Sequence, residues 1–205
     1  DLGQTTLAQQ PTLLTETGVN VWRFADSGEA NPSRVAAAGT LQAGWTGPTM
    51  IAGWFRLPDA AGDITGTNVP FGHRTNTTNR RLITGTSSTG DRVTWSVSGD
   101  GSVVSLTNFP TPFVGGGFAY LEWFFDPLNT LGGTTDFDRA KFAVNLTLQT
   151  RVADAAQAPP ATLHDSLAAL YLCSTSATTS GPDRMDWAGV LSYTNGIPSL
   201  VQSRW

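Results

Sequence analysis

Few acidic side chains in this sequence are spaced closely enough to act together. The nearest pair is Asp136 and Asp138, which follow Gly132-Gly133 in a segment rich in Gly and Thr. A retaining glycosidase needs two carboxylates about 5 Å apart, but carboxylates in such loops also supply the oxygen ligands that Ca²⁺ prefers. We therefore predict Asp126, Asp136 and Asp138 as candidate calcium ligands, with catalysis by the pair as the alternative.

A second polar group combines a histidine, an arginine and an amide. His73, Arg74 and Asn76 are the residue types with which a polysaccharide lyase would remove a proton and neutralise a uronate. An ordinary polar loop between Val69 and Arg80 explains the same residues without any reaction. We therefore predict that His73, Arg74 and Asn76 bind a ligand, and we predict no catalytic residue.

The other residue types give no support to zinc or nucleophilic chemistry. His73 and His164 are far apart in the sequence, and Cys173 is the single cysteine. A zinc site needs several His or Cys ligands, a disulfide needs two cysteines, and a catalytic triad needs an activated Ser or Cys beside a base. Cys173 lies in an apolar run and is predicted to be a small buried residue. No cofactor is expected apart from calcium.

The seven tryptophans are candidates for stacking on sugars, because an exposed ring offers a flat apolar face. Trp54, Trp95 and Trp123 stand within alternating strand patterns and are predicted to lie in the core. Trp45 stands outside these patterns, between a Gly and a Thr-Gly pair. We therefore predict that Trp45 and the loop His73–Asn79 contact any bound carbohydrate.

Composition excludes other classes of function. The 205 residues carry a formal net charge of -4 with 12 Lys and Arg in total, and no basic stripe is present that could neutralise several phosphates. No run approaches the ~20 consecutive apolar residues of a membrane-spanning helix. We expect neither a nucleic-acid partner nor membrane insertion, and the length suits one β-sandwich.

Period-two alternation of apolar and polar residues is the main structural signal. It predicts one long half-buried strand from Arg139 to Val152 and a second strand from Arg92 to Ser98. A turn at residues 98–101 then leads into Val103–Leu106, which makes a hairpin. The residues of the second strand that we expect to face inward are Val93, Trp95 and Val97.

Six further runs are too short, and too rich in aromatic and β-branched residues, to be helices. These predicted strands are Val19–Ala25, Thr49–Leu57, Arg81–Thr84, Phe118–Phe125, Leu167–Ser174 and Trp187–Tyr193. Clusters of Gly, Pro, Asn and Asp separate them, which favours antiparallel sheets over alternating strands and helices. Only two short helices are expected, at Arg34–Ala38 and Pro198–Ser203.

The chain is predicted to form one domain with a short extension. Residues 1–18 are polar and low in charge and form an amino-terminal arm, and residues 19–205 form a single β-sandwich. Asn129–Asp138 and Asp154–Pro160 are predicted as long surface loops. The arm is available for contacts between copies of the chain, so a homo-oligomer is one expectation.

The order of several segments resembles the concanavalin A-like jelly roll, and in particular its laminin-G-like branch. Thr49–Pro58 is similar to an early core strand of that family, Tyr120–Asp126 to its strand with Trp, apolar residues and Asp, and Arg139–Asn145 to the strand that follows. Two further parts of the chain complete the resemblance: Leu82–Gly85 and Arg92–Val97 resemble the pair of strands after the early core strand, and Trp187–Tyr193 with Ile197–Leu200 resembles the closing strand and short helix. Leu146 replaces the Gly that usually comes next, so we expect the strand to continue to Val152. The resemblance implies an all-β, antiparallel two-sheet jelly-roll sandwich, and it implies that calcium is sometimes bound.

The amino-terminal stretch adds an expectation about biological context. Gln10–Leu14 followed by Val21–Phe24 resembles the beginning of laminin-G-like modules in phage structural proteins and bacterial surface proteins. The laminarinase-type glycosidases of the same superfamily carry Glu-x-Asp-x-x-Glu, which this chain lacks. The sequence thus favours a non-catalytic binding or assembly module on a virion surface or outside the cell. It would recognise a glycan or a capsid or surface protein; the alternative is a divergent glycan hydrolase or polysaccharide lyase.

Overall fold

Strands account for most of the chain that the computed structural model describes. The described residues are 2–3, 12–16, 18–23, 35–37, 48–56, 71–74, 80–86, 92–102, 105–110, 118–152, 157–162, 164, 170–172 and 186–194. All strand pairs among them are antiparallel. The one helical turn in these ranges is the 3₁₀-helix η4, Asp136–Arg139, so the all-β prediction is confirmed.

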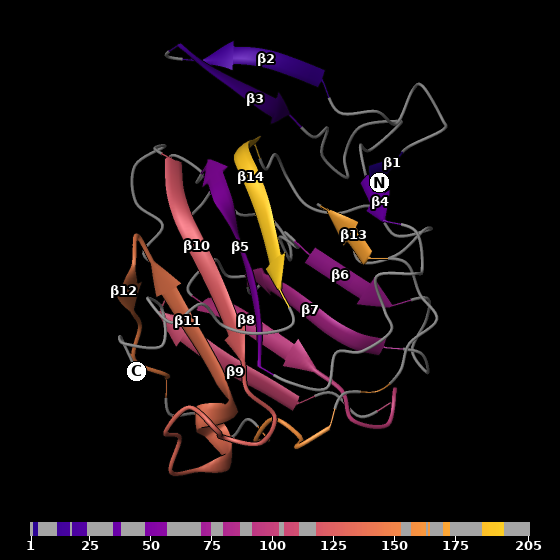
Figure 1. Ribbon diagram of the computed structural model, residues 1–205, viewed down its shortest axis with the longest axis vertical. Helices are drawn as coiled ribbons and strands as arrows, with labels where there is room; N and C mark the ends of the chain where they lie inside the picture. Colours follow the sequence, from indigo (N-terminus) through magenta and orange to yellow (C-terminus); the bar gives the residue numbers. More distant parts are fainter. Residues whose placement is uncertain are drawn as a thin grey trace.

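The described strands form two seven-stranded sheets (Figure 1). Sheet A has the order β1 (Leu2–Gly3), β4 (Val35–Ala37), β13 (Leu170–Leu172), β6 (Phe71–Arg74), β7 (Arg80–Thr86), β8 (Arg92–Val97) and β9 (Ser105–Pro110). Sheet B has the order β12 (Thr147–Leu148), β11 (Ala140–Val144), β10 (Phe118–Phe125), β5 (Thr49–Arg56), β14 (Asp186–Thr194), β3 (Val19–Arg23) and β2 (Thr12–Glu16).

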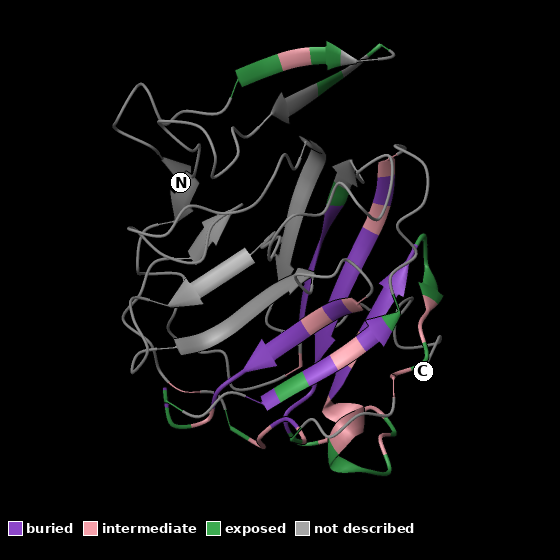
Figure 2. Ribbon diagram, turned by 180° about the vertical axis from the view of Figure 1, so that it is seen from behind, coloured by how far each residue is buried: buried purple, intermediate pink, exposed green. Residues whose placement is uncertain are grey.

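Large aromatic side chains fill the space between the two sheets. Trp95 of β8 meets the edge of Phe125 of β10 with ring centroids 6.4 Å apart, and Phe109 of β9 lies 5.8 Å from Phe142 of β11. Trp123 packs on Phe142 at 5.3 Å. In Figure 2 the buried, purple stretches lie along β8, β9, β10 and β11. These contacts bury the large apolar rings that dominate core energetics, and they confirm that Val93, Trp95 and Val97 face inward.

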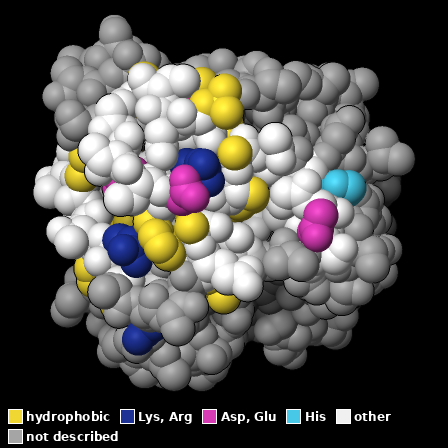
Figure 3. Space-filling model, turned by 90° about the horizontal axis from the view of Figure 1, so that it is seen from below, with side chains coloured by type: hydrophobic (Ala, Val, Ile, Leu, Met, Phe, Trp, Pro, Cys, Tyr) yellow, Lys and Arg dark blue, Asp and Glu magenta, His cyan; other side chains and the backbone are white. Residues whose placement is uncertain are grey.

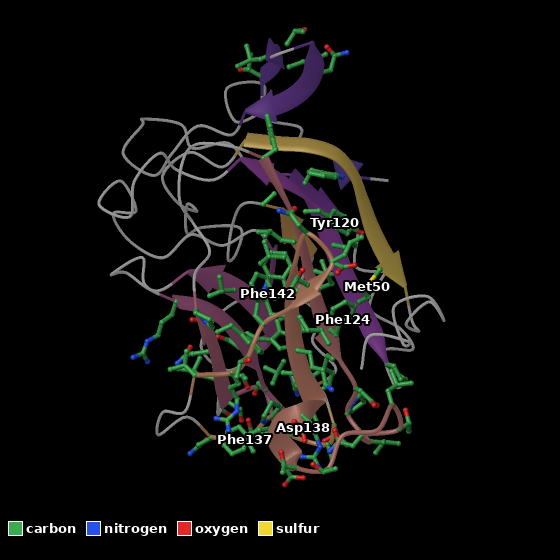
Figure 4. The ribbon with its side chains drawn as sticks, turned by 90° about the vertical axis from the view of Figure 1, so that its left-hand side faces the viewer. Met50, Tyr120, Phe124, Phe137, Asp138 and Phe142 are labelled. Atoms are coloured by element: carbon green, nitrogen blue, oxygen red, sulfur yellow. The ribbon has the colours of Figure 1, made fainter. Side chains whose placement is uncertain are left out.

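The outer face of sheet B, the face that points away from sheet A, carries its own small apolar cluster. Met50, Ala52, Phe124 and Ala143 are buried there, with Tyr120, Leu131 and Leu148 packed against them. Figure 4 shows Met50, Phe124 and Tyr120 on this side of the sheet and Phe142 on the other side. β10 is therefore buried on both faces over most of its length.

Two elements predicted from the sequence differ from the structure. Arg34–Ala38 was expected as a helix, but Val35–Ala37 is strand β4, which pairs with β1 and β13; pairing within a sheet overrides the weak helix preference of such a short stretch. The long strand Arg139–Val152 is interrupted, because the chain turns at Asn145 and Leu146 and returns as β12. The predicted helix Pro198–Ser203 lies outside the described residues.

The predicted hairpin after Arg92–Ser98 is present, and the predicted amino-terminal arm contains strands. The hairpin of β8 and β9 has its turn at residues 98–102, where Ser98 and Asp100 side chains accept backbone N–H groups of Gly101 and Ser102. Within the expected arm, β2 pairs with β3 and β1 pairs with β4, so strands of residues 1–18 belong to both sheets. No helix in the described ranges has the length and apolar character needed to cross a membrane.

Candidate functional site

The residues predicted to bind a ligand lie mostly beyond what the structure describes. Trp45 and Asn76 fall outside the described residues. His73 and Arg74 lie on β6, between β13 and β7, and for them only the backbone is described. Their roles as ligand-binding residues therefore stay predictions.

The predicted calcium ligands lie in the segment between β10 and β11, where their carboxylates accept hydrogen bonds. Asp126 is 1% exposed, and its two oxygens accept the hydroxyl of Thr130 at 3.1 Å and the backbone N–H of Leu131 at 2.8 Å. The backbone N–H of Asp126 donates to the backbone carbonyl of Arg139 at 2.7 Å. The carboxylate therefore holds the first turn of the segment, a structural role, while the backbone of Asp126 ties the start of the segment to its end.

Asp138 holds the turn that begins η4. Its Oδ2 accepts the backbone N–H groups of Thr134 and Thr135 at 3.0 and 2.8 Å, and also their hydroxyls at 3.3 and 3.0 Å. Partial burial by itself would raise the pKa of Asp138, but the hydrogen bonds from Thr135 and Thr134, with the charge of Lys141, lower it below the ordinary 3.8. Donors directed at the charged form stabilise that form.

Two arginines also brace this segment, Arg139 at its end and Arg151 beyond it. Arg139 pairs with Asp136 at 2.8 Å and donates from Nη1 to the carbonyl of Pro159 at 2.8 Å. The guanidinium of Arg151 lies 4.1 Å from the ring centroid of Phe137, in the range of a cation–π contact. Figure 3, a view of this end, shows basic and acidic side chains in contact beside apolar ones.

These contacts give the three aspartates partners other than a metal ion. Asp126 and Asp138 accept N–H groups, and Asp136 pairs with an arginine. In the part of the chain that the structure describes, no three His, Cys, Asp or Glu side chains gather as metal ligands. The calcium site at Asp126, Asp136 and Asp138 stays a prediction, and the described contacts support a bracing role instead.

One further pair of acidic residues was not predicted from the sequence. Glu122 and Asp126 are four residues apart on β10 and just beyond it, and both are 1% exposed. Four residues of extended chain span roughly 13 Å, which exceeds the separations of about 5 to 9.5 Å used by glycosidases. Their burial and spacing do not suit them to act together on a polysaccharide.

An exposed pair of aromatic residues that the sequence analysis did not predict lies on the outer face of sheet B. Trp54 of β5 was expected in the core, but it is 44% exposed on the outer face of sheet B. Tyr120 of β10 stands directly opposite it in the register, with ring centroids 5.5 Å apart and planes tilted by 43°. Trp95 and Trp123, each 1% exposed, are core residues as predicted.

The turn between β11 and β12 extends this surface to the next strand. Asn145 exchanges two hydrogen bonds with Tyr120: its backbone N–H donates to the Tyr120 carbonyl at 2.8 Å, and its Oδ1 accepts the Tyr120 N–H at 2.9 Å. Asn145 and Leu146 are both exposed. Trp54, Tyr120 and Asn145 therefore form a row across three adjacent strands, which we call the aromatic row.

Comparison with known proteins identifies a shared fold. The sequence matches no protein-family model and no curated protein. Among solved structures, the chain is similar over its full length to a structure of botulinum neurotoxin type C, whose cell entry is described as dependent on two ganglioside molecules. The TM-score is 0.66, the identity is 9%, and 46% of that chain is covered.

Two more structures show the same likeness. The binding domain of botulinum neurotoxin DC in complex with rat synaptotagmin II gives a TM-score of 0.63 at 9% identity, over 96% of this chain and 46% of that one. The same binding domain in complex with SialylT gives 0.64 at 9% identity, over 96% and 45%. This chain thus spans less than half the length of the chains it matches, and at this identity the likeness establishes the fold alone.

Proposed function

We propose that this chain is a non-catalytic binding or assembly module that recognises a glycan or a neighbouring protein. The observation that carries the proposal is the match of nearly the whole two-sheet fold to domains described as binding gangliosides, SialylT or synaptotagmin. Further support comes from the carboxylates of the described residues, because Asp126, Asp136 and Asp138 are occupied with local contacts.

Within this proposal, the fold is a concanavalin A-like jelly roll of the laminin-G-like branch. Three of the segments that carry the resemblance lie side by side in one sheet, as β5, β10 and β11, and two others lie in the second sheet, on β7 and β8. Two antiparallel sheets built from these segments support a sandwich of this kind. A crystal structure of the chain in which the strands connect in a different order would contradict this assignment.

The module would act at a virion surface or outside the cell, as part of a phage structural or bacterial surface protein. Its partner would then be a glycan, a capsid or surface protein, or a second copy of the chain. Exposed apolar residues support a contact role: Leu13 is 54% exposed and Leu128 is 66% exposed. Sedimentation velocity on the whole chain tests self-association, and a purely monomeric chain at high concentration would remove the homo-oligomer from the proposal.

The glycan part is tested with the labelled chain on an array of immobilised oligosaccharides, neutral and acidic. We expect retention of a defined subset of glycans. Trp45→Ala and His73→Ala test the surface predicted from sequence, and Leu106→Ala, an exposed residue of sheet A, serves as the control. Failure on every glycan would leave only recognition of a protein.

The alternative, a divergent glycan hydrolase or polysaccharide lyase, makes an opposite prediction about the polysaccharide itself. The chain is incubated with a panel of polysaccharides, and new reducing ends and unsaturated ends are measured over time. We expect neither product. Formation of either product that scales with the amount of purified chain would overturn the non-catalytic proposal.

A further inference from the structure

The position of Trp54 within its strand is unusual. Its neighbours along β5, Ala52 and Gly53, are buried, yet the Trp54 side chain is 44% exposed. Full burial of a large apolar side chain contributes roughly 1.5–3 kcal/mol, so this exposure forgoes part of that stabilisation. A single exposed apolar residue is ordinary, and what distinguishes Trp54 is the set of groups beside it.

Tyr120 gives Trp54 a second ring at a fixed angle. The two residues are paired in the register of β5 and β10, and their ring planes are tilted by 43° at 5.5 Å. Tyr120 is also held by the cluster beneath it, since it packs against Met50, Ala52, Phe124 and Ala143. The two rings therefore form an open angle on a rigid sheet rather than a closed stack.

Asn145 adds an oriented amide on the other side of Tyr120. Its Oδ1 accepts the Tyr120 N–H, which leaves the Nδ2 group as a donor directed away from that bond. Its backbone has a φ of 47° and is followed by Leu146 with a φ of 69°. These positive φ values form the tight two-residue turn that fixes the position of Asn145, and fixed polar groups lower the entropic cost of binding.

We propose that the aromatic row of Trp54, Tyr120 and Asn145 is the site at which the module binds a neutral hexopyranose chain. The inference rests on the proposed binding function and names its ligand and site. The C–H faces of a sugar pack on the aromatic rings, and Nδ2 of Asn145 donates to a sugar hydroxyl. The row spans two strand spacings, roughly 9.5 Å, which is wider than one sugar ring.

The charges of the row and of the whole chain favour a neutral sugar over an acidic one. None of the three side chains in the row is ionised at neutral pH, and the whole chain carries a formal net charge of -4. An acidic sugar would meet long-range repulsion and find no cationic partner within the row. A neutral ring needs only the stacking faces and the amide donor.

The test uses the whole folded chain labelled with ¹⁵N and titrated with malto-, cello- and chito-oligosaccharides. Trp54→Phe assigns the Trp54 indole resonance. We expect that resonance and the Asn145 side-chain amide to shift on titration, while the indoles of Trp95 and Trp123, which are 1% exposed, stay in place.

Variants then separate the contributions of the row. Trp54→Ala should weaken binding about tenfold or more, and Trp54→Phe should retain part of the affinity. Asn145→Asp keeps an acceptor for the Tyr120 N–H and removes the Nδ2 donor, so it should also weaken binding. Leu106→Ala is the matched control on sheet A and should bind as the unmodified chain does. Thermal unfolding of each variant confirms that it is folded.

Three results would overturn the inference in different ways. If an oligosaccharide binds and folded Trp54→Ala binds it equally well, the site lies elsewhere, for instance at Trp45, while glycan recognition stands. If none of the neutral oligosaccharides shifts any resonance but acidic glycans are retained on the array, the assignment of the ligand class is wrong. If no glycan of either kind binds, the glycan half of the proposed function fails together with this inference.

Discussion

Asn145 and Leu146 both adopt a backbone conformation that favours glycine. Their φ values are 47° and 69° in the two-residue turn between β11 and β12, which is the combination required by a type I′ hairpin turn. Asn tolerates it because its short polar side chain bonds locally, and here Oδ1 accepts the Tyr120 N–H. Leu146 has no such compensation from its apolar side chain, so the strain is concentrated at Leu146.

Leu146→Gly should therefore stabilise the protein. The left-handed conformation costs a residue with a Cβ roughly 1–2 kcal/mol, and the greater freedom of Gly in the unfolded chain offsets about 0.5–1 kcal/mol of the gain. We expect an increase of roughly 0.5–1 kcal/mol in the free energy of unfolding, measured by urea denaturation. Leu146→Ala keeps the strain and should give no gain. An equal gain in both variants would show that loss of the exposed Leu side chain is the cause.

Asp138 makes stability depend on pH in a predictable direction. Its pKa in the folded chain lies below 3.8 because of the donors from Thr134 and Thr135 and the charge of Lys141. A folded pKa below the unfolded one means that the carboxylate stabilises the fold above the unfolded value. That contribution is lost as the pH falls below 3.8 and through the folded pKa.

Asp138→Asn should remove this part of the pH dependence. The free energy of unfolding should fall less steeply with decreasing pH below about 4 in the variant than in the unmodified chain. Thr135→Val removes one hydroxyl donor and keeps the backbone donors, so it should show an intermediate slope. Parallel slopes for all three proteins in denaturant titrations would contradict the assigned role.

At the scale of elements, the sequence predicts strands better than it predicts which face of a strand is covered. β10 has the predicted bounds, and β5 and β8 each end one residue earlier than predicted. Trp54 and Trp95 stand in equally regular patterns, yet Trp95 is buried and Trp54 is exposed. The alternation of residues along a strand identifies its two faces but not which of them meets the other sheet. Strand pairing between residues far apart in the sequence decides which face is covered.

Turns and sites follow less directly from sequence. The period-two pattern runs through Asn145 and Leu146 without a break, so the sequence does not reveal the turn between them. The turn forms nevertheless, because the pairing of the flanking strands outweighs the low preference of Leu for a turn. The loop at Asn129–Asp138 was predictable from its Gly and Thr content. The hydrogen bonds of Asp126 and Asp138 inside it were not, because a carboxylate that braces a loop and one that binds calcium have the same sequence signature.

Trp95 joins the two sheets by a hydrogen bond as well as by packing. Its Nε1 donates to the carbonyl of Phe124 at 3.0 Å in a buried environment. Trp95→Phe removes this buried hydrogen bond between the sheets and opens space beside Phe125. We expect a loss of about 2–3 kcal/mol in the free energy of unfolding. Trp54→Phe, at an exposed position, should cost less than about 1 kcal/mol; equal losses would argue against the inter-sheet role of Trp95.

On the scale of the whole molecule, stability should be graded across sheet B. β10 lies between β11 and β5 and is buried on both faces over most of its length, whereas β2 is an edge strand with exposed Thr12, Leu13 and Thr15. Local opening costs least where few apolar contacts are buried. In hydrogen exchange followed by mass spectrometry, amides of β10 should exchange most slowly and those of β2 most rapidly. Uniform exchange across the sheet would contradict this gradient.

The burial of β10 on both faces also restricts how its length can change. Side chains alternate strictly between the faces of a strand, so one inserted residue exchanges the faces of everything beyond it. An insertion after Leu121 would carry the Glu122 carboxylate into the layer between the sheets and turn Trp123 outward. Natural or engineered insertions within β10 should therefore be tolerated only in pairs.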